Sequence, residues 1–172
     1  MKKRLGAIIV VSCYIIILTT PCFAKTYMQK DRLFKMDIPK GWIWDQRSDS
    51  ISIKNQKTKN DIFIKLLFLP MVSYSDAGLK KGMQMIIATE VESVKGSVIS
   101  EGEIRIDGVY ARKLEYVWTN DNKAVHTTII IFVYEKCLMR IVFSTDSTDE
   151  RLTMKKIVKT LRLLRLASPV RK

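Results

Sequence analysis

The spacing of hydrophobic residues predicts an extended opening to the folded part of the chain. In the stretch 33–38, Phe34, Met36 and Ile38 alternate with polar residues and share one face, the period-two pattern of a β-strand. After a turn at 39–41, Trp42 and Trp44 begin an extended segment, and further strands are predicted at 51–54 and 62–69, preceded by turns at 48–50 and 57–60. The last of these strands is apolar on both faces apart from Lys65, which is typical of a strand covered on both sides.

A long helix is predicted next, because apolar residues recur at spacings of three and four. Ser75 or Asp76 can cap its N-terminus, and the pattern continues to about Val94 before Gly96 ends it. The apolar side of this helix consists of Leu79, Met83, Ile86, Ile87 and Val94.

Four strands joined by short turns follow, at 98–106, 109–119, 125–134 and 138–144. Such hairpin connections predict an antiparallel meander. The economical arrangement of three strands, a helix, four strands and a helix is one antiparallel sheet packed by helices. The sequence therefore predicts an α+β fold, an antiparallel β-sheet flanked by helices.

The closing helix has a clear start signal and two distinct faces. Ser147 or Thr148 can cap it, and Asp149 and Glu150 in the first turn complement the helix dipole. Its apolar face carries Met154, Ile157, Val158, Leu161 and Leu164. A basic stripe of Arg151, Lys155, Lys159 and Arg162 lies roughly opposite.

Residues 1–24 read as a secretory signal peptide. Three basic residues at 2–4 precede an almost unbroken apolar run over 5–18, which is short for a transmembrane helix, and Pro21 follows. Cleavage is predicted between Ala24 and Lys25. Two alternatives remain open: lipidation at Cys13 or Cys22, and retention as an uncleaved anchor.

The predicted domain organisation is simple. After the signal we expect a flexible N-terminal segment at 25–32, one domain at 33–165 and a basic tail at 166–172. The composition, 47% hydrophobic with seven glycines and four prolines, suits a packed core rather than a disordered chain. The formal net charge of +13 is not an artefact of the signal, since the signal contributes only three of the 30 basic residues.

The residues that carry chemistry are few. One histidine and three cysteines do not supply the usual zinc or disulfide patterns, so we expect no metal site and no cofactor. His126 lacks an evident catalytic partner, and Cys137 is expected to be a part-buried thiol that behaves as a small hydrophobe. Trp42, Trp44 and Trp118 are candidates for binding a ring-bearing ligand, although their alternating strands favour packing. No catalytic residue is assigned.

Three charges interrupt apolar faces and form a candidate buried charge cluster. Glu90 lies on the apolar side of the long helix, and Arg112 and Arg140 each stand between apolar residues of a strand. A buried charge is costly unless it is paired, so we expect Glu90 to meet Arg112 or Arg140. The functional alternative is a small anion site made by both arginines.

The basic residues also suggest a docking face. Lys80 and Lys81 open the long helix, and together with the basic stripe they are predicted to face phospholipid headgroups, lipopolysaccharide or an acidic partner. The simpler interpretation is a solvated charged surface. The full candidate face is Lys80, Lys81, Arg151, Lys155, Lys159 and Arg162.

The stretch from Phe34 to Trp42 resembles the opening of the PsbP-like and DcrB-like domains, in which an alternating strand runs into Pro-x-Gly-Trp. The resemblance covers most of residues 31–165. It implies an antiparallel sheet flanked by helices, related to the Ran-binding release factors of eukaryotes. Photosynthetic members are extrinsic subunits of the oxygen-evolving complex, and bacterial relatives are exported or lipid-anchored envelope proteins. No family ligand residue transfers to this chain.

Taken together, these features predict an exported accessory or binding domain of the bacterial envelope, periplasmic or secreted, that is not an enzyme. Its partner is expected to be an envelope protein or an anionic surface, and contact with a membrane is compatible with either. Nucleic acid is not expected, since the chain lacks the aromatic, glycine-rich and zinc-finger motifs that bind it. The alternatives are a peripheral membrane or polyanion-binding module and a hydrolase with a site assembled by folding.

Overall fold

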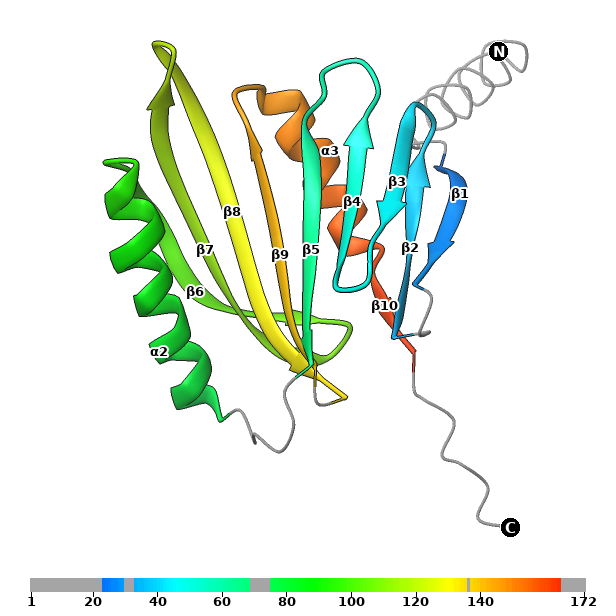
Figure 1. Ribbon diagram of the computed structural model, residues 1–172, viewed down its shortest axis with the longest axis horizontal. Coiled ribbons are helices and arrows are strands. Elements are labelled where there is room, and N and C mark those ends of the chain that lie inside the picture. The colour runs from blue at the N-terminus through cyan, green and yellow to red at the C-terminus, as the bar shows by residue number, and fades with distance from the viewer. Residues whose placement is uncertain (1–22, 30–32, 69–74, 136, 165–172) are drawn as a thin grey trace, which may run out of the picture.

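The computed structural model describes residues 23–29, 33–68, 75–135 and 137–164. It contains two antiparallel sheets, one of three strands in the order β1-β2-β10 and one of seven in the order β3-β4-β5-β9-β8-β7-β6 (Figure 1). The strands of the small sheet are β1 (Phe23–Met28), β2 (Phe34–Pro39) and β10 (Arg162–Leu163). Those of the large sheet are β3 (Trp42–Gln46), β4 (Ser50–Asn55), β5 (Asp61–Phe68), β6 (Ser97–Ile106), β7 (Val109–Asn120), β8 (Lys123–Tyr134) and β9 (Cys137–Thr145).

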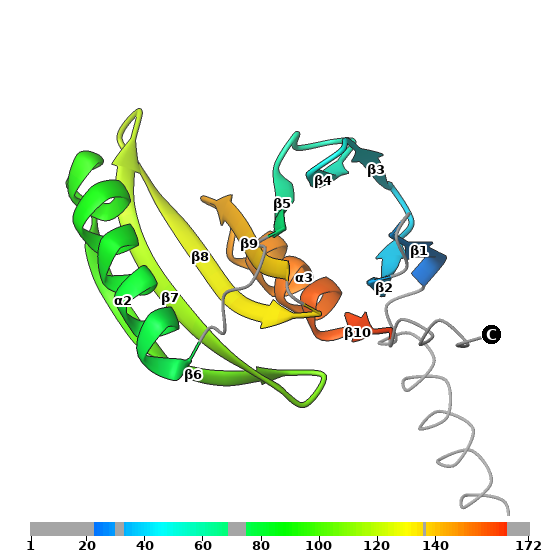
Figure 2. The same ribbon diagram turned by 60° about the horizontal axis from the view of Figure 1, so that its bottom comes forward.

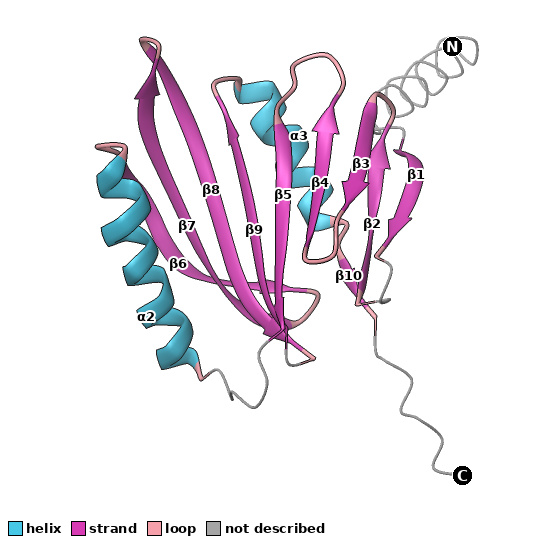
Figure 3. Ribbon diagram, viewed as in Figure 1, coloured by secondary structure: helices cyan, strands magenta, loops and turns pink. Residues whose placement is uncertain are grey.

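Two helical elements cover opposite faces of the large sheet (Figure 2). Helix α2 (Asp76–Ile86) continues into a π-helical segment, η1 (Ile87–Val91), and packs over β7 and β8. Helix α3 (Thr148–Lys159) lies on the other face, enclosed between β8–β9 and the small sheet. The α+β fold with an antiparallel sheet flanked by helices is therefore confirmed (Figure 3).

Each face of the large sheet has its own core. The α2 side contains Leu79, Met83 and Val91 against Leu114 and Ile129. The α3 side is larger and unites the inward residues of both sheets with the apolar face of α3. Helix α3 contributes Met154, Ile157 and Val158, and Leu161 joins the same core just after the helix ends. The period-two and period-3.6 patterns thus place their residues correctly. The predicted continuation of this helix to Leu164 is wrong, because α3 ends at Lys159 and Arg162 and Leu163 pair with β2 as β10.

The meander of β6 to β9 is confirmed, with tight turns whose residues adopt positive φ. At the β6–β7 turn, φ is 48° for Asp107 and 85° for Gly108. The end of the long helix differs in detail from the prediction, since Lys95, with φ of 52°, takes the left-handed position instead of Gly96. Gly96 is needed for space, because a Cβ there would lie 3.1 Å from Val91 Cγ1.

The predicted flexible segment at 25–32 is wrong for residues 25–28. These residues form most of β1 and pair with β2, with Tyr27 opposite Met36, and Tyr27 is buried. Pairing with β2 gives the backbone N–H and C=O groups of these residues hydrogen-bond partners, which a flexible segment would not have. The regular pairing begins at Lys25, after an irregularity that follows Phe23. The predicted signal core and the tail at 166–172 lie outside the described residues.

Strand β5 is covered on one side only, contrary to the prediction for 62–69. Ile62, Ile64 and Leu66 are buried against the α3 side, whereas Phe63 and Leu67 are 38% and 37% exposed on the other face. Among the described elements, helix α2 lies over β7 and β8 and not over β5, so none of the described helices covers this face of β5 (Figure 1).

Candidate anion-binding groove

The candidate site lies along α3, whose start is fixed by side-chain capping. Ser147 is the N-cap, and its hydroxyl accepts a hydrogen bond from the Glu150 backbone N–H at 3.3 Å. The buried positions of α3 face the core, and Lys155 and Lys159 lie beside them on the flank of the helix that is directed toward β6 to β8. The packing of α3 thus determines where the basic stripe points.

A cavity of about 570 Å³ opens between α3 and strands β6 to β8, and we call it the α3 groove. This volume lies within the range of small-molecule sites, which runs from roughly 300 to 1,000 Å³. Its apolar lining comes from Ile104, Ile106, Ile130, Val158 and Leu161. Its charged lining comes from Arg105, Asp107, Lys113, Lys155, Lys159 and Arg162, so five cations meet one acid.

Glu115 joins two of these cations beneath the groove. Its carboxylate lies 2.6 Å from Lys155 Nζ and 3.4 Å from Lys113 Nζ, and it accepts a hydrogen bond from Ser100 at 3.1 Å. Burial by itself would raise the pKa of Glu115. The hydrogen bond from Lys155, the charges of both lysines and the bond from Ser100 outweigh it and lower the pKa to about 2. Glu115 therefore remains ionised and neutralises part of the rim.

The other rim charges are not neutralised by carboxylates. Arg105 donates to the Gly108 carbonyl at 2.9 Å, and Arg162 donates to the carbonyls of Lys159 and Leu161 at 3.0 Å each. Asp107 is engaged by the Leu163 backbone N–H at 2.9 Å. Within the described residues, no carboxylate comes within ion-pair distance of Arg105, Lys159 or Arg162. The groove therefore keeps an excess of positive charge.

The six residues of the predicted docking face do not form one surface. Lys80 and Lys81 are exposed on α2, while the basic stripe lies on the α3 side of the sheet. The sequence could not reveal this separation, because it does not state which face of the sheet each helix covers. Of the stripe, Lys155, Lys159 and Arg162 line the groove, and Arg151 lies outside its lining, beside His126.

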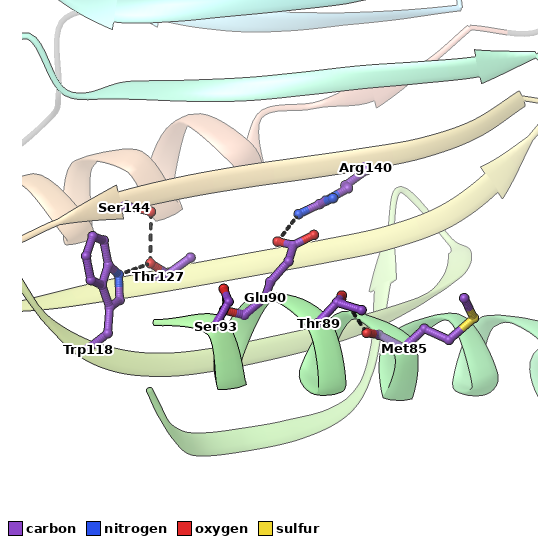
Figure 4. A network of polar contacts seen from close by, with 8 residues as sticks. All are labelled: Met85, Thr89, Glu90, Ser93, Trp118, Thr127, Arg140 and Ser144. Atoms are coloured by element: carbon purple, nitrogen blue, oxygen red, sulfur yellow. Dashed lines mark hydrogen bonds and ion pairs between the residues drawn. The ribbon is translucent and has the colours of Figure 1, made fainter. Parts of the chain in front are cut away.

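The charge cluster is separated into two groups. Glu90 forms an ion pair with Arg140 at 2.5 Å, which is one of the two predicted pairings. Figure 4 shows this contact reaching from the helix to β9. Arg112 instead binds Glu101 and Glu103 of β6 at 2.6 and 3.3 Å. Hydrogen bonds to Tyr110 and Glu101 raise the Arg112 pKa above its ordinary value.

A single anion site made by both arginines is therefore not formed. Ile131 of β8 pairs with Arg112 on one side and with Arg140 on the other, so it stands between them in the sheet. Each guanidinium is paired with glutamate side chains.

Trp118 is part of a structural hydrogen-bond network. Its indole N–H donates to the Thr127 hydroxyl, which lies 2.8 Å from the Ser144 hydroxyl (Figure 4).

The remaining candidates have structural surroundings. Nδ1 of His126 lies 2.9 Å from Nη1 of Arg151, a permanent donor, so this ring nitrogen accepts the hydrogen bond. Cys137 is buried in the core, more completely than predicted. Trp42 and Trp44 line a separate opening of about 400 Å³. There Trp44 packs against Tyr27 with ring centroids 5.5 Å apart, and Trp42 packs against the core.

Sequence reasoning missed the half of the groove supplied by the sheet. Lys113 and Glu115 occupy inward-facing positions of β7, in line with Ala111, where the alternation calls for apolar residues. Two polar residues at core-facing positions were a signal that this end of the sheet stays open to solvent or to a ligand. Ile104 and Arg105 of β6 carried no such signal.

The fold has known counterparts. The solution structure of cyanobacterial PsbP (CyanoP) from Synechocystis sp. PCC 6803 matches with a TM-score of 0.63 and 14% identity, over 81% of this chain and 92% of that one. This chain has the PsbP-like fold. The predicted PsbP-like resemblance is thereby confirmed for the architecture, and the DcrB-like resemblance stays a prediction.

Two further structures share the PsbP-like fold. A crystal structure from Bacteroides thetaiotaomicron matches with a TM-score of 0.62 and 11% identity over 83% of this chain, which spans only 49% of that protein. A Pseudomonas aeruginosa protein of unknown function, described as a putative regulator, matches with a TM-score of 0.52 and 15% identity over 84% of this chain and 98% of that one. A shared fold does not fix a function, which must be argued from the site.

Sequence comparison finds no match: no protein-family model and no curated protein matches this chain. In the part of the chain that the structure describes, no helix is long and apolar enough to cross a membrane. Nor do the described residues bring together three or more His, Cys, Asp and Glu side chains that could hold a metal ion.

Proposed function

We propose that this PsbP-like protein is an exported, non-catalytic accessory domain of the bacterial envelope that binds an anionic partner in the α3 groove. The observation that carries the proposal is the composition of the groove, in which five cations and one acid surround an apolar floor. Three of the cations lack a carboxylate partner among the described residues, so an anion there gains favourable interactions without breaking an existing ion pair.

The non-catalytic part of the proposal rests on how the reactive side chains are used. His126 accepts a hydrogen bond from Arg151, and Cys137 is enclosed in the core. The groove contains one carboxylate in its lining, Asp107, which already accepts the Leu163 N–H. A general acid and base, or a nucleophile with its base, would need two such groups within reach of each other.

Vesicle binding tests the anionic partner. The protein from its envelope fraction is expected to bind phosphatidylglycerol vesicles at low salt, to release them at high salt and to ignore phosphatidylcholine vesicles. Replacing Lys159 and Arg162, two of the cations without a carboxylate partner, with Gln should weaken binding by about 30-fold, because each cation near an anionic surface contributes about 1 kcal/mol. Sedimentation of the vesicles with bound protein provides the measurement.

The matched control is the pair Lys80→Gln and Lys81→Gln, which removes the same charge from the other side of the sheet. We expect it to retain most of the binding. Equal losses in both double variants would show a response to net charge and contradict a site in the groove. Equal binding of the unaltered protein to neutral and anionic vesicles would contradict the proposal as a whole.

Export is tested by the intact mass of the protein purified from its own envelope fractions. The mass of a chain that begins at Lys25 is the expected result. This cleavage would leave the regular β1–β2 pairs, which begin at Lys25, in place. A species that retains residue 1, or carries lipid on Cys13 or Cys22, would contradict release by cleavage and make the domain a tethered one.

A further inference from the structure

The α3 groove combines two surfaces of different character. Ile106, Ile130, Val158 and Leu161 of its lining belong to the main hydrophobic core or border on it, so the floor of the groove is continuous with the core. Ile104 is half-buried and extends this floor toward the edge strand β6. The other four apolar lining residues are only 1–8% exposed, so a ligand gains hydrophobic free energy mainly by covering Ile104 and by burying its own hydrocarbon in the groove.

The floor discriminates between classes of anionic ligand. A polysaccharide, or the acidic surface of a folded protein, can meet the cations at the rim but leaves the recessed apolar floor hydrated. A small anion such as phosphate fills little of a cavity of about 570 Å³. A ligand with an anionic end and a hydrocarbon end satisfies both surfaces at once.

We infer that the α3 groove takes a single-chain anionic amphiphile, a fatty acid or an alkyl phosphate in chemical class, with its chain on the isoleucine floor and its head at the basic rim. This inference rests on the proposed function and specifies its ligand. The chemistry is shared by free amphiphiles and by one chain of an anionic membrane lipid.

The head lies among the rim cations that have no carboxylate partner. Lys155 and Lys113 are already bound to Glu115. Lys159 is exposed. Arg105 and Arg162 donate hydrogen bonds to backbone carbonyls, and these neutral acceptors do not compensate the positive charge of the two arginines. Lys159 is therefore the principal contact of the head, with the two arginines adding to the field.

A series of ligands with one head and increasing chain length tests the inference. Inorganic phosphate and hexyl, octyl and decyl phosphate are titrated below their critical micelle concentrations by isothermal calorimetry. Each buried methylene contributes about 0.8 kcal/mol, so affinity should rise by up to about fourfold per methylene until the chain fills the cavity. The uncharged decyl maltoside should bind much more weakly than decyl phosphate.

Two substitutions on β6 locate the chain. Ile104→Glu places a carboxylate on the floor of the groove and should lower the affinity for decyl phosphate at least tenfold. The matched control is Ile99→Glu on the same strand, where the isoleucine is 53% exposed and outside the groove lining, and it should bind like the unaltered protein. Should Ile104→Glu not fold, Lys159→Gln provides the second test, since it should lower the affinity for every alkyl phosphate by a similar factor.

The outcomes separate the inference from the function on which it rests. Equal affinities for inorganic phosphate and decyl phosphate would overturn the amphiphile while leaving an anion site in place. Equal affinities for decyl phosphate and decyl maltoside would overturn the anionic head and the proposed function with it. Binding of phosphatidylglycerol vesicles without binding of any alkyl phosphate would overturn the free amphiphile and indicate a bilayer surface as the source of the head.

Discussion

Glu150→Ala is expected to lower the free energy of unfolding by about 3 kcal/mol, the largest effect of any single change away from the apolar core. The Glu150 carboxylate is buried and accepts hydrogen bonds from Asn55 at 2.8 Å, from Asn60 at 2.5 Å and from Thr58. Thr145 adds a longer bond of 3.3 Å. Removal of the carboxylate breaks all of these bonds at once and takes this acceptor from the buried Thr145 hydroxyl and the half-buried amides of Asn55 and Asn60. For a chain of this size the melting temperature should fall by about 10 °C.

The control is Asp149→Ala, one residue earlier in the same helical turn. Asp149 is exposed and contributes through the helix dipole, so its loss should cost less than about 1 kcal/mol. Chemical denaturation of both variants provides the comparison. Similar losses in the two would show that Glu150 acts only as a first-turn acid, and the inferred network would then contribute little to stability.

Stability is expected to fall steeply in acid, with a contribution on the order of 3 kcal/mol from Glu115 alone, because its pKa is lowered from 4.5 to about 2 in the folded protein. The folded state binds this proton less readily than the unfolded state does. The stabilisation is therefore complete above pH 4.5 and is lost as the pH falls toward 2. Glu150 adds to the same trend, since the hydrogen bonds it accepts outweigh the effect of burial and lower its pKa.

The contribution of Glu115 is isolated with Lys155→Met, which removes the hydrogen bond and the nearest positive charge. The variant should be less stable than the unaltered protein at neutral pH, and the difference should shrink as the pH approaches 2. Lys156→Met, at the exposed neighbouring position, provides the control and should follow the unaltered protein. Parallel pH profiles for all three proteins would contradict the lowered pKa.

The order and type of most elements followed from the sequence. The strands of the meander and the starts of both helices lie close to their predicted positions, because each depends on local periodicity and turn chemistry. The closing helix, however, ends at Lys159 and not near Leu164. The errors concern segments that are ordered by distant partners. Strand β1 pairs with β2, and β10 pairs with the other edge of β2 from more than 120 residues further along the chain.

The candidate site was predicted only in part, for the same reason. Lys155, Lys159 and Arg162 were identified from their helical spacing, but their role as one wall of a groove depends on β6 and β7. The grouping with Lys80 and Lys81 failed because spacing along the chain does not tell on which side of the sheet a helix packs. The pairing of Glu90 with Arg140 was expected because a charge on an apolar face requires a partner.

What the sequence determined by itself is the meander, the two helices with their inward faces and the spacing of the basic residues along α3, since these depend on residues a few positions apart. What only the tertiary structure decided is how distant polar residues are used. Glu150, expected only to complement the helix dipole in the first turn, turns inward and accepts hydrogen bonds from Asn55 and Asn60 at the β4–β5 turn. Glu115 joins a strand to α3, and the α3 groove exists because the curled sheet brings β6 opposite that helix (Figure 2). Such contacts depend on the packing of elements, which local periodicity does not encode.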